Sequence, residues 1–377
     1  MPREAELEKK VQAILESAIA EGELPCANVM VLHRDQVICY TQAGRDPGTG
    51  EEISRDTIFR LYSQTKPVTS AAVCLLMERG IIDMNDPVEK YLPGFANPKV
   101  LQPDGEMVPA ERPVKLMDLM GMCAGLCYPM EDAPGQYAAR LFDDNQAAMD
   151  EGKPGLTTVE FANEIGKLPL AFQPGTAFRY STCADVLGAV VEVASGKRYG
   201  DFLREEIFEP LEMPDTGFCL PEEKLPRLVT CAKRTPEGIQ VMECRHLNVG
   251  NYTREPAFAS GGAGLVSTLE DLRSAFGPDR SISLCRELTK LHEEVVRTTL
   301  EEAVEKYTEN PPKGEFVLVV AGAEPEEKET ASETDAASHV AALMARGLSR
   351  KDAIKQTAKD LDLPKNVVYD AALKIEE

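Results

Sequence analysis

The chain contains no tryptophan, and aromatic residues make up only 6% of its 377 residues. Few rings are therefore available to stack on nucleic-acid bases. Basic residues are also scarce, because 41 Lys and Arg face 63 Asp and Glu, which gives a formal net charge of −22. This balance argues against nucleic-acid binding by the chain as a whole.

Long apolar runs are missing as well. No run reaches the roughly eighteen apolar residues that a membrane-spanning helix requires. The first residues are charged and lack the apolar centre of a secretory signal, so we expect a cytoplasmic protein with no membrane partner. The ten cysteines are scattered. Cys123 and Cys127 lie four apart with no second close pair, so we expect buried thiols, no metal and no cofactor.

The periodicity of apolar residues predicts a protein of mixed helix and strand. Helices are predicted at residues 4–21, 63–80, 113–122, 158–167, 182–196 and 198–208. Two β-rich runs around Arg34 and Asp35 predict a hairpin over residues 28–42. Residues 81–112 are expected to be loop with short helical turns, and residues 130–155 to be irregular.

A serine and a lysine at the start of the second predicted helix could perform acyl transfer. Ser63 and Lys66 are three residues apart, so their Cβ atoms lie about 5–6 Å from each other on one helix face. A serine hydroxyl needs a neighbouring base to become a nucleophile. A lysine can serve once it is neutral, which burial and the positive end of the helix dipole favour. Taken alone, the pattern is more typical of a helix cap followed by a solvated lysine.

The surrounding sequence is more specific. Residues 58–95, which include IFRLYSQTKPVTSAAVCLLMERG, resemble the nucleophile region of the serine β-lactamase and penicillin-binding-protein family, in particular its class C and esterase-type members. The resemblance continues in the family's order at residues 112–128, 178–218 and 259–272. It implies a β-lactamase-like antiparallel sheet flanked by helices.

The resemblance also implies roles for individual residues. Ser63 matches the acylated nucleophile, Lys66 its proton acceptor and Tyr180 the tyrosine of the second motif, which passes a proton to the leaving group. Thr182 stands where the family often has Asn, which suits an esterase better than an enzyme acting on amides. Gly261 and Gly262 are candidates for lining the substrate site, although a structural bend is the favoured interpretation.

The family's third motif has no convincing match after residue 272. The nearest phrase, Lys313-Gly314, lacks the intervening residue. The strands that normally complete the central sheet follow that motif, so their loss predicts an exposed sheet edge and marginal stability.

The tail resembles a second family. Residues 277–307, 312–324 and 344–373 are similar to the C-terminal part of the small-subunit rRNA ribose-2′-O-methyltransferase of the tetrapyrrole-methylase superfamily. That family's N-terminal, cofactor-binding domain has no counterpart here, so S-adenosylmethionine binding is not implied. The basic residues of the terminal helices leave an RNA-facing surface as an alternative to the favoured solvated face.

The two resemblances therefore predict that the chain is a chimera of parts from two families. The expected parts are a hydrolase domain over residues 1–272, a methyltransferase-like α/β fragment over 273–322, an acidic linker over 323–336 and a helical hairpin over 337–377, with a charged helix at 291–307 inside the second part. The expected function is hydrolysis of a small-molecule ester or amide through an acyl-enzyme on Ser63. The alternative is an inactive chimera or an interaction protein.

Overall fold

The computed structural model describes residues 2–33, 36–244, 247, 252–276, 281–286, 294–299, 316–320, 339–341, 343–344, 349–360, 367–369 and 372. The chain divides into two compact units, Met1–Pro278 and Asp279–Glu377. Each unit is described by itself.

The first unit mixes helices with short antiparallel strand pairs. Its α-helices are α1 Pro2–Ala20, α2 Thr65–Glu78, α3 Leu116–Met120, α4 Ala133–Asp150, α5 Thr158–Lys167, α6 Cys183–Ser195, α7 Tyr199–Leu203 and α8 Leu269–Phe276. Its shorter helical turns are η1 Tyr62–Gln64, η2 Val88–Lys90, η3 Pro93–Phe95, η4 Arg204–Phe208 and η5 Glu222–Arg227. Its strands are β1 Cys26–His33, β2 Gln36–Gly44, β3 Phe59–Arg60, β4 Lys99–Leu101, β5 Met107–Pro109, β6 Ala232–Thr235, β7 Gly238–Val241 and β8 Val266–Ser267.

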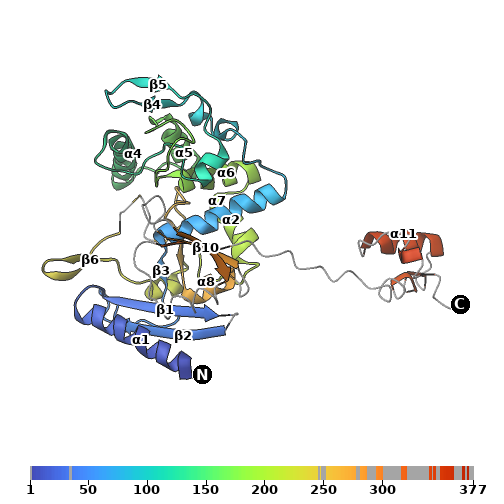
Figure 1. Cartoon of the computed structure of the whole chain (residues 1–377), viewed down its shortest axis with the longest axis horizontal. Helices are drawn as coiled ribbons and strands as arrows, with labels where there is room; N and C mark the ends of the chain where they lie inside the picture. Colours follow the sequence, from blue (N-terminus) through green and yellow to red (C-terminus); the bar gives the residue numbers. More distant parts are fainter. Residues whose placement is uncertain are drawn as a thin grey trace. The chain divides into compact units, whose positions relative to one another are not determined.

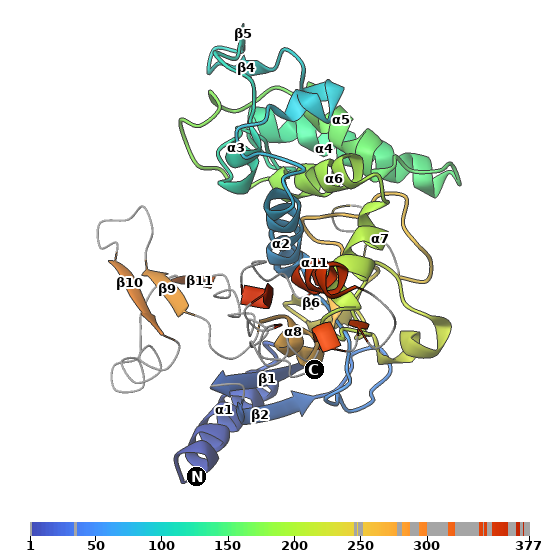
Figure 2. The ribbon, with the colours of Figure 1, turned by 90° about the vertical axis from the view of Figure 1, so that its right-hand side faces the viewer.

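Helix α2 lies between two groups of elements in this unit. Helices α3, α4, α5 and α6 gather at one end, and α1 lies along the β1–β2 hairpin at the other (Figure 1, Figure 2). The predicted helix at 4–21 and the predicted hairpin at 28–42 are confirmed, although the turn residues Arg34 and Asp35 lie outside the described residues.

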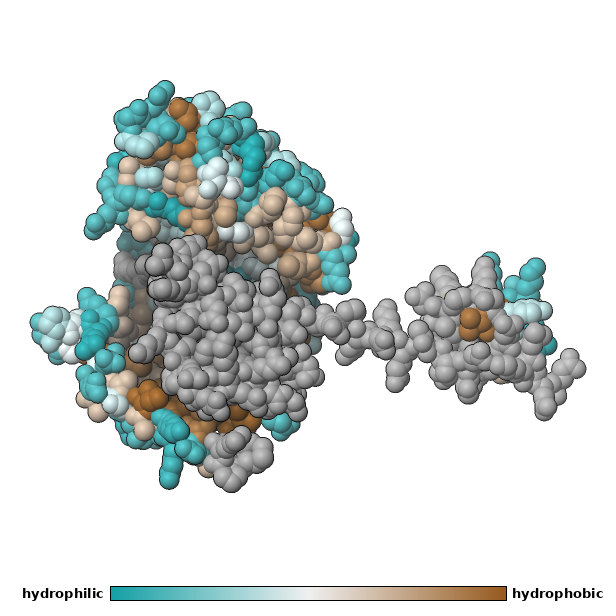
Figure 3. All heavy atoms as spheres, in the orientation of Figure 1, coloured by the Kyte–Doolittle hydropathy of each residue, from teal (hydrophilic) through white to brown (hydrophobic). Residues whose placement is uncertain are grey.

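The strand pairs of the first unit are short. Strand β3 pairs with β8, so it joins the segment before Ser63 to the segment after Gly264. Strands β6 and β7 form a hairpin that extends from the body of the unit, and its exposed side chains are mostly hydrophilic (Figure 3). Strands β4 and β5 form another hairpin within residues 81–112, where we expected only loop and helical turns.

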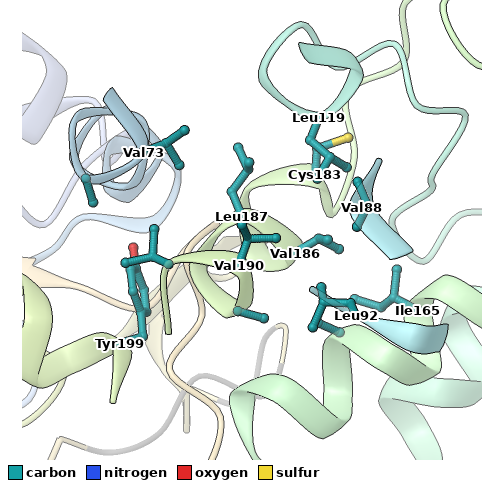
Figure 4. Close-up of a cluster of buried hydrophobic side chains, with 14 of the residues drawn as sticks. Val73, Val88, Leu92, Leu119, Ile165, Cys183, Val186, Leu187, Val190 and Tyr199 are labelled. Carbon is teal, nitrogen blue, oxygen red and sulfur yellow. The ribbon is translucent and has the colours of Figure 1, made fainter. Parts of the chain in front are cut away.

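The hydrophobic core of the first unit is built around α6. Every residue from Cys183 to Val191 is buried, and all of them except Asp185 are small or apolar. Leu187 and Val190 of α6 lie between Val73 of α2 and Ile165 of α5 (Figure 4). The core therefore holds α2, which begins directly after Ser63, against α6, which begins directly after the Tyr180 segment.

The expectation of irregular structure at residues 130–155 was wrong, because α4 occupies most of it. The Asp132 side chain caps this helix by accepting a hydrogen bond from the Gly135 N–H at 3.1 Å. Ala138 and Phe142, four residues apart, are buried on one helix face. Interspersed Asp and Gln residues obscured that apolar stripe in the sequence.

The second unit contains the strands β9 Ser281–Arg286, β10 Glu294–Thr299 and β11 Phe316–Val320 and the helix α11 Arg350–Asp360. Strand β9 pairs antiparallel with β10 on one side and β11 on the other. The expected helix at 291–307 was therefore wrong at β10, where β-branched Val and Thr residues favour a strand. Ser349 caps α11 by accepting a hydrogen bond from the Asp352 N–H on its Oγ at 3.2 Å. The expected linker at 323–336 lies outside the described residues.

Candidate active site

A sharp backbone turn presents Ser63 at the start of α2. Tyr62, the residue before it, has a φ of 45°, which is a left-handed conformation that non-glycine residues adopt only when their surroundings hold them there. On one side of this turn the Leu61 N–H donates to the Leu265 carbonyl at 2.9 Å. On the other side the Leu265 N–H donates to Thr65 Oγ1 at 3.1 Å. These bonds fix the start of the helix against the glycine-rich segment.

Ser63 and Lys66 are in contact, as their spacing predicted. Lys66 Nζ lies 3.2 Å from Ser63 Oγ, within hydrogen-bond distance. The same nitrogen donates to the Gly262 carbonyl at 2.8 Å. Ser63 is exposed, so its hydroxyl is accessible to a substrate. Lys66 is partly buried, and the Gly262 carbonyl fixes the position of its amine.

Tyr180 is brought to the same place from far along the chain. Its ring centroid lies 4.6 Å from Lys66 Nζ, and its side chain is 47% exposed. The ring of Tyr128 lies 5.3 Å from the same nitrogen and 6.0 Å from the Tyr180 ring. The structure therefore brings together all three residues that the sequence assigned to catalysis, and adds Tyr128 as a second ring beside the lysine.

Asp185 connects these groups and was given no chemical role from the sequence. Its carboxylate is 2% exposed. Oδ1 accepts hydrogen bonds from Ser260 Oγ at 2.5 Å and from the Gly262 N–H at 3.0 Å, and Oδ2 accepts one from the Tyr128 hydroxyl at 3.4 Å. Burial raises the pKa of Asp185, while these donors and the nearby charge of Lys66 act in the opposite direction. Asp185 thus fixes the loop whose carbonyl binds Lys66.

The predicted substrate-binding residues are in less accessible positions. Thr182 is fully buried, and its hydroxyl lies 3.5 Å from the Cys127 carbonyl. A Cβ atom on Gly261 would lie 2.3 Å from the Ala184 carbonyl oxygen, and one on Gly262 would lie 2.7 Å from Asp185 Oδ2. Close packing therefore requires glycine at both positions, which agrees with the structural-bend interpretation.

A second buried hydroxyl supports the glycine-rich segment. Thr69, one turn after Lys66, donates to the Gly261 carbonyl at 2.6 Å, and the Tyr199 hydroxyl lies 2.6 Å from the same Thr69 oxygen. Both residues are fully buried. The segment is thus fixed to α2 by Thr69 and to α6 by Asp185.

The described residues carry few other features that could bind a ligand. Within them, no group of three His, Cys, Asp or Glu side chains could hold a metal ion. Cys127 is buried, and its thiol lies 3.8 Å from the Gly125 carbonyl. None of the described helices is long and apolar enough to cross a membrane. Lys313 and Gly314, the nearest phrase to the third motif, lie outside the described residues.

Comparison with known families agrees with this fold. The family model described as Beta-lactamase matches residues 8–318, so the chain belongs to the beta-lactamase family. The chain is 29% identical to "Esterase EstB" of Burkholderia gladioli over 289 residues, which is 72% of this chain and 69% of that esterase. It is also similar to the solved structure of "EstCE1, a hydrolase with promiscuous acyltransferase activity", with a TM-score of 0.59, 26% identity and 73% of each chain covered.

A separate match concerns the tail. The chain is 45% identical to "Ribosomal RNA small subunit methyltransferase I" of Synechocystis sp. over 112 residues, which is 30% of this chain and 40% of that enzyme. The chain thus spans well under two thirds of the methyltransferase's length. Both resemblances found in the sequence are confirmed, since the chain combines a match to the beta-lactamase family with a methyltransferase-like C-terminus.

Proposed function

We propose that this chain is a serine acyl-hydrolase of the esterase type that acts on a small-molecule ester. The observation that carries the proposal is the 3.2 Å separation of Ser63 Oγ and Lys66 Nζ, with Ser63 exposed and the Tyr180 ring beside the lysine. A hydroxyl, an amine and a phenol in this arrangement can pass a proton from nucleophile to leaving group.

In the first half of the reaction Lys66 acts as the neutral amine, and Ser63 Oγ attacks the ester carbonyl carbon while its proton moves to Lys66 Nζ. The C–O bond to the leaving alcohol then breaks, and that alcohol takes up a proton through the Tyr180 hydroxyl. The Ser63 backbone N–H stabilises the negative charge that develops on the carbonyl oxygen. The product of this half is an acyl-enzyme on Ser63 and a free alcohol.

In the second half a water molecule attacks the acyl carbon and gives up its proton to the same pair of groups. The bond to Ser63 Oγ breaks, Oγ regains a proton and the carboxylic acid leaves. An alcohol in place of water would give acyl transfer instead. EstCE1, a structurally similar hydrolase with promiscuous acyltransferase activity, supports this range.

The test is turnover of p-nitrophenyl acetate and butyrate by the full chain, with nitrocefin as the β-lactam comparison. We expect ester turnover in the wild-type protein and its loss in Ser63→Ala. Ser70→Ala is the matched control, because Ser70 lies on α2 about two turns beyond Ser63 and has no part in the proposed mechanism. Equal turnover by Ser63→Ala and wild type would overturn the mechanism. No turnover by a folded wild-type chain would favour the inactive chimera.

A further inference from the structure

The hydroxyl of Tyr62, the residue before Ser63, contacts two thiols. Tyr62 Oη lies 3.1 Å from Cys244 Sγ and 3.7 Å from Cys231 Sγ. Cys231 immediately precedes β6 and Cys244 follows β7, so the two cysteines lie at the base of one hairpin. Its base is closed by the Met242 N–H, which donates to the Cys231 carbonyl at 2.9 Å. Both thiols are partly buried and unbridged.

The two sulfur atoms are close to each other. Since both sulfur atoms contact the same oxygen, their separation cannot exceed the sum of those two distances. A disulfide requires sulfur atoms about 2.05 Å apart and Cβ atoms about 3.5–4.5 Å apart. Antiparallel pairing and the Met242–Cys231 hydrogen bond place residues 231 and 242 side by side, and Cys244 lies two residues further on, so a disulfide requires the two sulfur atoms to approach each other.

The third member of the cluster links it to the site. Tyr62 immediately precedes Ser63 and has the left-handed φ of 45°. A non-glycine residue keeps such a conformation only when its surroundings hold it, and the two thiols are part of what surrounds its hydroxyl. A change in their bonding therefore acts on the turn that presents Ser63.

We propose that Cys231 and Cys244 are a redox pair that a peroxide converts into a disulfide, and that this bond lowers activity at Ser63. The Cys231 sulfur, as thiolate, attacks one peroxide oxygen; the O–O bond breaks, leaving a sulfenic acid and hydroxide. The Cys244 sulfur then attacks the Cys231 sulfur, and the S–O bond breaks. Both thiol protons and both oxygens leave as two waters, so two thiols are oxidised while hydrogen peroxide is reduced.

The consequence for Tyr62 follows from this bond. Oxidation removes both S–H groups and draws the sulfur atoms together, so the Tyr62 hydroxyl loses its present arrangement of partners. The effect on turnover rests on the proposed function, whereas formation of the disulfide does not.

The experiment treats the full chain with hydrogen peroxide and maps its peptides without reduction. We expect a linked peptide pair containing Cys231 and Cys244, its absence in Cys231→Ser and Cys244→Ser, and its persistence in Cys74→Ser, a control at an exposed cysteine on α2. Ester turnover should fall at least twofold on oxidation, return with dithiothreitol, and stay unaffected in Cys231→Ser.

Two results would overturn the proposal. The first is that no such link forms, or that other cysteines pair in its place. The second is a fully linked protein with unchanged turnover. If the reduced wild type has no ester turnover, the proposed function is wrong, but the disulfide can still be tested. Hydrogen exchange over the segment containing Tyr62 and Ser63 then replaces turnover as the readout. Identical exchange in the linked and the reduced protein would contradict the proposal.

Discussion

Replacing Asp185 tests how the site is held together. In Asp185→Ala the Ser260 hydroxyl and the Gly262 N–H lose the carboxylate oxygen that accepts them at 2.5 and 3.0 Å. Each buried donor left without a partner costs about 1–3 kcal/mol, so two donors should lower the free energy of unfolding by about 2–6 kcal/mol. Asp185→Asn keeps the volume and an acceptor oxygen, and should cost about 1–2 kcal/mol.

The same pair of variants separates positioning from stability. Gly262 supplies the carbonyl that binds Lys66 at 2.8 Å, so movement of this loop in Asp185→Ala should lower kcat for p-nitrophenyl esters about 10- to 100-fold. Asp185→Asn should restore most of that loss. The measurements are urea unfolding followed by circular dichroism, and kcat and KM below the unfolding transition. Wild-type stability and turnover in Asp185→Ala would refute the reasoning.

The shifted pKa of Asp185 makes the free energy of unfolding depend on pH. Burial raises its pKa in the folded protein above its ordinary value, which in the unfolded chain is about 3.9. The stabilisation linked to its protonation is therefore complete below that value and is lost as the pH rises through the folded pKa. Stability should fall over this range more steeply in the wild type than in Asp185→Asn. Parallel pH profiles of unfolding free energy would contradict this sign.

Two further substitutions address the other parts of the site. Tyr180→Phe keeps the ring beside Lys66 but removes the hydroxyl, so kcat should fall by at least about 100-fold with little change in thermal stability. Ester kinetics measure this effect. An unchanged kcat would show that Tyr180 does not transfer the proton. Gly262→Ala places a Cβ atom 2.6 Å from the Tyr128 hydroxyl and 2.7 Å from Asp185 Oδ2. Overpacking should lower the free energy of unfolding by about 1–3 kcal/mol, measured by urea unfolding. The control is Gly200→Ala, whose Cβ would lie at an ordinary 3.4 Å from its nearest neighbour. Equal stability of the two variants would show that the loop is not tightly packed.

Local patterns in the sequence predicted the helices and the Ser63–Lys66 contact. Three residues along one helix bring two side chains together whatever the rest of the chain does. The contribution of Asp185 could not be read this way, because it depends on packing α6 against Ser260 and Gly262, far along the chain. The left-handed turn at Tyr62 carries no sequence signal either, since no glycine marks it.

The wrong predictions have similar causes. Charged residues obscured the buried face of α4, although Asp132 and Pro134 are typical of a helix start. At β10 the charged residues suggested a helix, while pairing with β9 and the β-branched residues produced a strand. In both segments tertiary contacts, rather than average composition, determined the structure.

The central claim is that Ser63 forms a covalent acyl-enzyme, and it is tested most directly by mass. The full chain is incubated with a fluorophosphonate, which reacts irreversibly with activated serines, and its intact mass and peptides are measured. We expect one adduct per chain, located at Ser63, in the wild type and in Ser70→Ala, and none in Ser63→Ala. An adduct at another residue, or equal labelling of Ser63→Ala, would contradict the proposed chemistry.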